Sequence, residues 1–282
     1  MKKIFIVILA FTSAISHSKI TQIYKTSDKS TLSLEELIQE IPPSGQYILG
    51  EFHNTKEIQD AQAQLIHEKV LFEKAQNGFS VFWEFLNYTD EEKTQINWDL
   101  FKTNQIDSTQ FITNTAGAQN LSYSPIFETT KTLLGDIKGI NLPRAIKQKI
   151  IKEGIQAIDP KYIPQNHYVG GPEYKERFEI AMGGHAPQDV IEKYFLVQCL
   201  TDSVMAEKIS INDKHSMNFI IAGSFHTDFY DATVIRLRKL VNYDIITFKF
   251  VTKNNISAEE LDNFKTGDKK YGAFADYIVI TE

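Results

Sequence analysis

The sequence predicts an α/β fold with a largely parallel central sheet flanked by helices and a helical subdomain inserted at the carboxyl edge of the strands. Two observations support this prediction. Short apolar runs typical of buried strands alternate with segments of helical spacing along most of the 282 residues. Several of these runs also end in ionisable residues, and open α/β sheets bind ligands at the carboxyl ends of their strands.

Each predicted strand is a short apolar run, and each predicted helix shows helical spacing or a capping pattern. The predicted strands cover residues 46–50, 79–83, 138–142, 218–222, 244–251 and 275–281. The predicted helices cover residues 56–77, 125–135, 144–154, 187–211 and 232–241. Ser33 and Glu36 form a capping-box pattern, which predicts one more helix start.

The organisation of the chain is predicted to be one α/β domain over residues 19–282. Helical insertions are expected at about 87–121 and 155–211. The first is rich in Asn, Gln and Thr but carries Trp98, Phe101 and Phe111, which fits short helices or a lid.

The first residues resemble an export signal. Lys2 and Lys3 precede the apolar run 4–11, and small residues follow at Ala14 and Ser16. We therefore expect residues 1–18 to be a signal peptide and the protein to be periplasmic or secreted. The single cysteine, Cys199, lies far from this region and allows no internal disulfide, so no lipid-modified N-terminal cysteine is expected.

Composition and charge narrow the class of protein. The chain has 42% hydrophobic and 23% charged residues, which is typical of a folded globular protein. Its formal net charge of −6 provides no basic field for nucleic acid, so no nucleic-acid binding is expected.

Polar side chains at the predicted strand ends form a candidate site. Glu51 and His53 follow the first core strand, Glu84 the second, Arg144 the third and His226 the fourth. The carboxyl ends of parallel strands meet at one edge of a sheet, so these five side chains are expected to converge there as a catalytic site. His and Glu side chains suit general acid–base chemistry, and His53, Glu84 and His226 would also suit a divalent metal. Arg144 is equally interpretable as a structural partner of a carboxylate.

Six ordered motifs carry a resemblance to a known family. They are LGEFH (49–53), FWEF (82–85), GINLPR (139–144), Gln198 with DSVMA (202–206), IAGSFH (221–226) and ADYIV (275–279). With these motifs in this order, the chain resembles the ChaN family, which is the haem-binding uptake branch of the Tiki / erythromycin-esterase-like superfamily. The resemblance implies an α/β core with a helical subdomain and a role in bacterial haem or iron acquisition. The sequence departs from the family in lacking a cysteine to lipidate and a Gly-Val-Pro-like turn after His226.

The same resemblance implies how haem would be held. In this family haem lies between two subunits, a tyrosine binds the iron, and basic or imidazole groups touch the propionates. It therefore implies a homodimer on haem binding and an outer-membrane haem uptake system as a partner. It does not fix the tyrosine: Tyr168 and Tyr174, with His167 and His185 nearby, are the candidates for haem binding, and packing in the core is the alternative for each.

Two functions remain open from the sequence. The first is an exported haem-binding protein of haem or iron acquisition. The second is a metal-dependent or acid–base hydrolase of the protease or esterase type, like relatives in the wider superfamily, that uses Glu51, His53, Glu84 and His226. A third possibility is that the polar residues at the edge of the sheet have no function, in which case the protein would bind neither haem nor metal.

Overall fold

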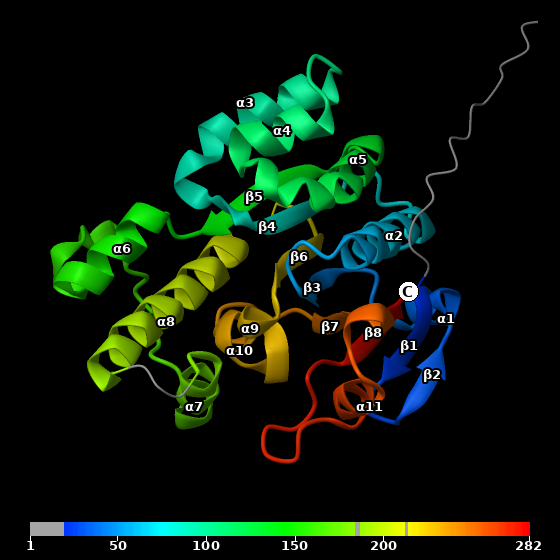
Figure 1. Cartoon of the computed structure of the whole chain (residues 1–282). Helices are drawn as coiled ribbons and strands as arrows, with labels where there is room; N and C mark the ends of the chain where they lie inside the picture. Colours follow the sequence, from blue (N-terminus) through cyan, green and yellow to red (C-terminus); the bar gives the residue numbers. More distant parts are fainter. Residues whose placement is uncertain (1–19, 184–186, 212–213) are drawn as a thin grey trace, which may run out of the picture.

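The computed structural model describes residues 20–183, 187–211 and 214–282, and its sheet has eight strands within these ranges (Figure 1). Their bounds are β1 Ile20–Lys25, β2 Ser30–Leu32, β3 Gly45–Glu51, β4 Phe79–Asn87, β5 Asp136–Asn141, β6 Met217–Gly223, β7 Ile245–Thr252 and β8 Tyr277–Thr281. The strand order is β2-β1-β8-β7-β3-β6-β4-β5. Pairs from β8 to β5 are parallel and β1 runs antiparallel to its neighbours, so the predicted largely parallel sheet is confirmed. The expected signal peptide, residues 1–18, lies outside the described residues.

Helices cover both faces of the sheet. Their bounds are α1 Leu34–Glu40, α2 Lys56–Phe72, α3 Glu91–Lys102, α4 Ser108–Thr115, α5 Ser124–Thr132, α6 Arg144–Glu153, α7 Pro172–Ala181, α8 Gln188–Ile211, α9 Ser224–Thr227, α10 Ala232–Arg238 and α11 Ala258–Thr266. Short 3₁₀ helices are η1 Tyr88–Asp90, η2 Ala118–Tyr123, η3 Ile155–Ala157, η4 Pro160–Tyr162, η5 Asp228–Tyr230 and η6 Lys253–Asn255. Figure 1 shows α2 and α5 on one side of the sheet and α8 and α10 on the other. No helix in the described part of the chain is long and apolar enough to cross a membrane.

Alternation along β3 explains why both faces need helices. Every residue of this central strand is buried. Tyr47 and Leu49 belong to the hydrophobic core under α2, whereas Ile48 belongs to a second core under α8 and α10. Successive side chains of a strand point to opposite faces, so a continuous apolar run requires a cover on each side.

The segment 87–121 is packed into the larger of these cores. Trp98, Phe101 and Phe111 are fully buried. The ring centroid of Phe111 lies 5.1 Å from that of Phe127 on α5, and Phe127 lies 4.8 Å from Trp83 in β4. The aromatic rings of this segment therefore contribute to the main core of the protein.

Three groups of elements were not predicted from the sequence. β1 and β2 form one edge of the sheet and precede the first predicted strand, α7 lies in the helical insertion expected at about 155–211 without having been placed there, and α11 follows β7. The capping box of α1 is present as predicted: Ser33 and Glu36 exchange side-chain and backbone hydrogen bonds.

Candidate functional site

Four of the five predicted site residues lie together at the carboxyl edge of the sheet. Glu51 ends β3, Glu84 lies in β4, and His226 lies in α9 directly after β6. His53 follows β3, and its Nε2 is 3.9 Å from Glu84 Oε1. His226 Nε2 is 3.3 Å from the same oxygen. Glu84 Oε1 is therefore faced by two imidazoles that come from different segments.

Glu51 holds His53 in place. The Glu51 side chain is 1% exposed, and its Oε1 lies 3.0 Å from His53 Nδ1. Gln59 on α2 donates to Glu51 Oε2 at 3.0 Å, and the Tyr123 hydroxyl donates to Oε1. With Nδ1–H directed at Glu51, His53 presents Nε2 as its basic nitrogen. Burial opposes the charged imidazole, but the hydrogen bond to Glu51 and the charge of Glu84 raise the pKa of His53 overall.

The second pair is the buried ion pair of Glu84 with His226. Burial would raise the pKa of Glu84, but the positive charge of His226, with His53 and the Gly223 N–H, lowers it to about 2. Gly223 N–H donates to Glu84 Oε2 at 2.6 Å. Burial would lower the pKa of His226, but the charges of Glu84 and Asp202 raise it to about 10. His226 is therefore an imidazolium at neutral pH.

Asp202 on α8 anchors His226 from behind. Its Oδ1 lies 2.6 Å from His226 Nδ1 and accepts from Thr233 Oγ1 at 3.0 Å. Its Oδ2 accepts the Tyr174 hydroxyl at 2.6 Å and lies 4.0 Å from Arg236 Nη1. Asp202 is fully buried, and a buried carboxylate needs this set of donors to remain charged.

Arg144 is not part of the cluster, which corrects the prediction. It is exposed as the first residue of α6, and no hydrogen bond or ion pair in the described residues joins it to the site. Lys147, one turn later, donates to Asn141 Oδ1 at 2.9 Å, and Asn141 Nδ2 donates to the Glu84 C=O at 2.8 Å. Burial lowers the pKa of Lys147. Lys147 is thus one cation near this edge that the sequence did not single out.

The edge opens into a cavity of about 580 Å³, here called the edge cavity. Its lining includes Glu51, His53 and His226 together with Arg177 and Lys249. It also includes five phenylalanines: Phe52, Phe178, Phe225, Phe229 and Phe264. A concave site that combines aromatic side chains with placed polar groups is typical of small-molecule binding.

The predicted metal site does not have the required geometry. Among the described residues, no group of three or more His, Cys, Asp and Glu side chains is arranged to hold a metal ion. We therefore do not propose His53, Glu84 and His226 as metal ligands.

Tyr168 and Tyr174, the predicted haem-binding tyrosines, lie in different environments. Tyr174 is fully buried, and its hydroxyl donates to Asp202. Burial and the charge of Asp202 raise the pKa of Tyr174 well above its usual value, so its phenol stays neutral. These observations contradict the prediction that Tyr174 binds iron. Predicted His185 lies outside the described residues.

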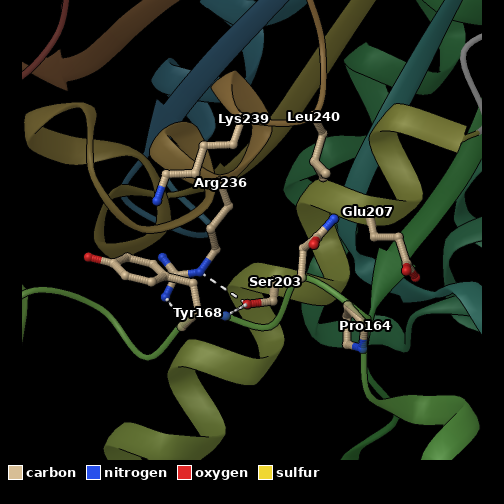
Figure 2. Close-up of a pocket in the computed structure, with 8 residues that line it drawn as sticks. Pro164, Tyr168, Ser203, Glu207, Arg236, Lys239 and Leu240 are labelled. Atoms are coloured by element: carbon tan, nitrogen blue, oxygen red, sulfur yellow. Dashed lines mark hydrogen bonds between the residues drawn. The ribbon is translucent and has the colours of Figure 1, made fainter.

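Tyr168 is half-buried at a pocket of about 230 Å³, here called the Tyr168 pocket, on the side of α8 and α10 (Figure 2). The Arg236 guanidinium carbon lies 5.1 Å from the centre of the Tyr168 ring, and Lys239 Nζ lies 4.1 Å from it. Figure 2 shows the hydroxyl end of the ring directed away from Ser203, Glu207 and Pro164. His167 Nδ1 is 3.3 Å from Ser203 Oγ, and burial, with the charge of Arg236, lowers the pKa of His167.

A comparison with known protein families shows to which family the chain belongs. The family described as haem-binding uptake, Tiki superfamily, ChaN matches residues 37–237. The chain belongs to the ChaN family. The matched range includes the polar edge, Tyr168 and Arg236, whereas β1, β7 and β8 lie outside it. No protein in a search of curated sequences matches.

Three solved structures are similar to this chain. A structure described as cofacial haem binding to ChaN of Campylobacter jejuni is 18% identical, covers 93% of this chain and 96% of its own, and has a TM-score of 0.69. The type III effector HopBA1 is 12% identical over 88% of this chain and 93% of its own, with a TM-score of 0.44. An erythromycin esterase, EreC, is 14% identical over 82% and 77%, with a TM-score of 0.43.

Several site residues were missed because no local pattern marks them. Tyr123 and Gln59 reach Glu51 from separate helical segments, and Gly223 contributes only its backbone N–H. Asp202 was indicated in part, because its spacing of four residues from Gln198 places both on one face of a helix. Gln198 Nε2 lies 3.2 Å from His226 Nδ1, so this spacing did point toward the site.

Proposed function

We propose that this ChaN-family protein binds haem at the Tyr168 pocket and serves bacterial haem or iron acquisition as an exported protein. The observation that carries the proposal is the placement of Tyr168 at a pocket with two cations close to its ring, within the range that matches the family. A phenolate is a hard anionic ligand known to hold haem iron.

The size of the pocket supports a shared haem site. At about 230 Å³ it is smaller than the roughly 300–1,000 Å³ of sites that enclose a drug-sized ligand, and the Tyr168 hydroxyl is directed away from Ser203, Glu207 and Pro164 of its lining (Figure 2). A haem bound to this oxygen would therefore lie against the rim of the pocket. A second copy of the chain would cover the remainder, which implies a homodimer on haem binding. The similar Campylobacter jejuni structure is described as binding haem cofacially. An outer-membrane haem uptake system is the proposed partner in transport.

Titration with haemin tests the proposal. Wild-type protein is expected to saturate, with a Soret band and a charge-transfer band of phenolate-ligated ferric haem. Tyr168→Phe is expected to lose the charge-transfer band, because it removes the oxygen that binds iron while keeping the ring close to its cations. Tyr194→Phe is the control, because Tyr194 is an exposed tyrosine on α8 outside the Tyr168 pocket.

Two results would count against this function. If the wild type shows no saturable haemin binding, the proposed function is wrong. If the spectrum of Tyr168→Phe is unchanged, haem binds at another site. Sedimentation of the haemin-saturated protein is expected to show a dimer. Export is tested separately: expression in a Gram-negative host should yield periplasmic or medium protein that begins near residue 17 or 19, whereas full-length cytoplasmic protein would contradict it.

An acid–base hydrolase at the edge cavity is the second candidate. The Glu51–His53 pair in the lining of this cavity favours it, because Glu51 orients His53 so that Nε2 can take a proton from water. Protein purified without haem would be assayed against a series of p-nitrophenyl esters of increasing acyl length. His53→Gln should abolish turnover, and His67→Gln, at a half-exposed position of α2 that does not line the edge cavity, should retain it. Equal rates in both variants would reject this activity.

A further inference from the structure

The segment that carries Tyr168 is tied to the rest of the described structure by two side chains. Residues 164–170 form neither helix nor strand. Ser203 Oγ on α8 accepts the Tyr168 N–H at 3.3 Å and lies 3.3 Å from His167 Nδ1. Arg236 Nη2 on α10 donates to the Tyr168 C=O at 2.7 Å (Figure 2). Arg236 and Ser203 therefore fix where the Tyr168 backbone lies.

Arg236 is itself held rigidly. Its side chain is 3% exposed. Its Nε donates to Ser203 Oγ at 3.1 Å and its Nη1 to the Ala232 C=O at 2.5 Å. The guanidinium thus makes three directional hydrogen bonds to two helices and one loop, an arrangement that its planar fork of donors permits.

Asp202 connects this guanidinium to the polar edge. Asp202 Oδ2 lies 4.0 Å from Arg236 Nη1, while Oδ1 faces the His226 imidazolium at 2.6 Å. One buried carboxylate is therefore compensated by two cations on opposite sides. Because Asp202 and Ser203 are adjacent on α8, the polar edge and the Tyr168 segment are supported by the same turn of helix.

We propose that Arg236 is a positioning residue of the haem site: it holds Tyr168 in the orientation that presents the phenolate to iron, and Asp202 holds Arg236. This inference rests on the proposed haem function. Lys239 acts differently, because it lies over the Tyr168 ring and supplies charge, whereas the described hydrogen bonds to the Tyr168 backbone come from Ser203 and Arg236. The role of Arg236 therefore depends on its shape as well as its charge.

The test compares two pairs of variants in haemin titrations of the full chain. Arg236→Lys keeps the charge but cannot make the three bonds together, and Ser203→Ala removes the other tether. Arg238→Lys is the matched control on α10, where Arg238 stacks on Tyr230 at 5.0 Å. Ser210→Ala is the control on α8, since Ser210 and Ser203 both donate to a carbonyl of the same helix.

Both test variants are expected to bind haemin about 10- to 100-fold more weakly, the range found when a partner of an iron or metal ligand is removed. Their saturated complexes should also show a weakened phenolate charge-transfer band. The controls should match the wild type in affinity and spectrum. A loss of folded protein alone would reduce the amount of complex but leave the spectrum of the bound form unchanged, and that outcome would overturn the positioning role.

The two levels of the hypothesis fail in different ways. If the wild type does not bind haemin, or binds it with no dependence on Tyr168, the proposed function is wrong. If the wild type binds through Tyr168 while Arg236→Lys and Ser203→Ala keep both affinity and spectrum, only the positioning role is wrong. Should Arg236→Lys fail to fold, Ser203→Ala still decides the question, because it removes only the single buried hydroxyl that joins the Tyr168 N–H to Arg236 Nε.

Discussion

The His226 imidazolium should make the stability of this protein depend on pH in the neutral to mildly alkaline range. The ordinary pKa of a histidine is about 6.5, and burial against Glu84 and Asp202 raises that of His226 to about 10. A raised pKa contributes stability that is complete below pH 6.5 and is lost as pH rises toward 10. Between these values the folded state binds one more proton than the unfolded state, so the free energy of unfolding should fall with pH.

The size of the effect follows from one proton. Its slope is about 1.4 kcal/mol per pH unit, so His226 alone should lower the free energy of unfolding by about 2 kcal/mol from pH 7 to pH 8.5, and the raised pKa of His53 adds to this drop. The range stops there because burial raises the pKa of Cys199 to about 12 from a usual value near 9, which adds its own loss above that pH. Guanidinium unfolding at pH 7.0, 7.5, 8.0 and 8.5 measures the decline.

The variant His226→Gln tests the assignment. It leaves Glu84 and Asp202 without their shared cation, which typically costs about 3–5 kcal/mol at neutral pH. That difference from the wild type should shrink by about 2 kcal/mol by pH 8.5, since the variant has no proton to lose at this position. His67→Gln, a change on a half-exposed histidine outside the site, should follow the wild type. A difference between His226→Gln and the wild type that stays constant with pH would refute the reasoning.

Two other substitutions test the supports of the site and the core. Tyr123→Phe removes the hydroxyl that donates to buried Glu51 and should lower the free energy of unfolding by about 1–3 kcal/mol in guanidinium melts, whereas no loss would mean that Glu51 is satisfied without it. Phe111→Ala empties a fully buried position between Trp98 and Phe127 and should cost about 3–5 kcal/mol. A cost below about 1 kcal/mol would show that residues 87–121 are not part of the main core.

The strands that form the site could be predicted because their signal is local. β3, β4 and β6 are continuous apolar runs, and a parallel sheet places the residues after them at one edge. That rule is enough to bring Glu51, Glu84 and His226 together. It gives no hydrogen-bond partners, so it could not show that Glu84 is shared between two imidazoles.

Arg144 illustrates where this rule stops. The rule places the start of α6 near the edge, but the rotation of the helix decides which side chain faces it. Arg144 lies six residues before buried Ile150, which rotates it by about 120° from the buried side. Lys147, three residues before Ile150, lies closer to that side and makes the contact with Asn141. Only tertiary packing fixes this rotation.

β1 and β2 were missed for a different reason. Their residues are mostly half-exposed, so the apolar alternation is weak, and β2 has only three residues. Their pairing depends on β8, which is distant in the sequence. The role of Tyr174 could not be predicted from the sequence either. A tyrosine that donates to a buried carboxylate and a tyrosine that lies at a pocket are not distinguished by their neighbours in the sequence.

The pairing of β1 with β8 has a consequence for folding. Thr21 Oγ1 donates to the Ile280 C=O across 259 residues of chain. Closing so long a loop is slow and costs entropy before any contact forms, whereas β3 and β4 are joined by a single helix, α2. We therefore expect the inner strands to assemble first and β8 to present an open edge until β1 docks. During that interval β8 could pair with another chain, so variants that delay the docking of β1 should aggregate even when the haem site is intact.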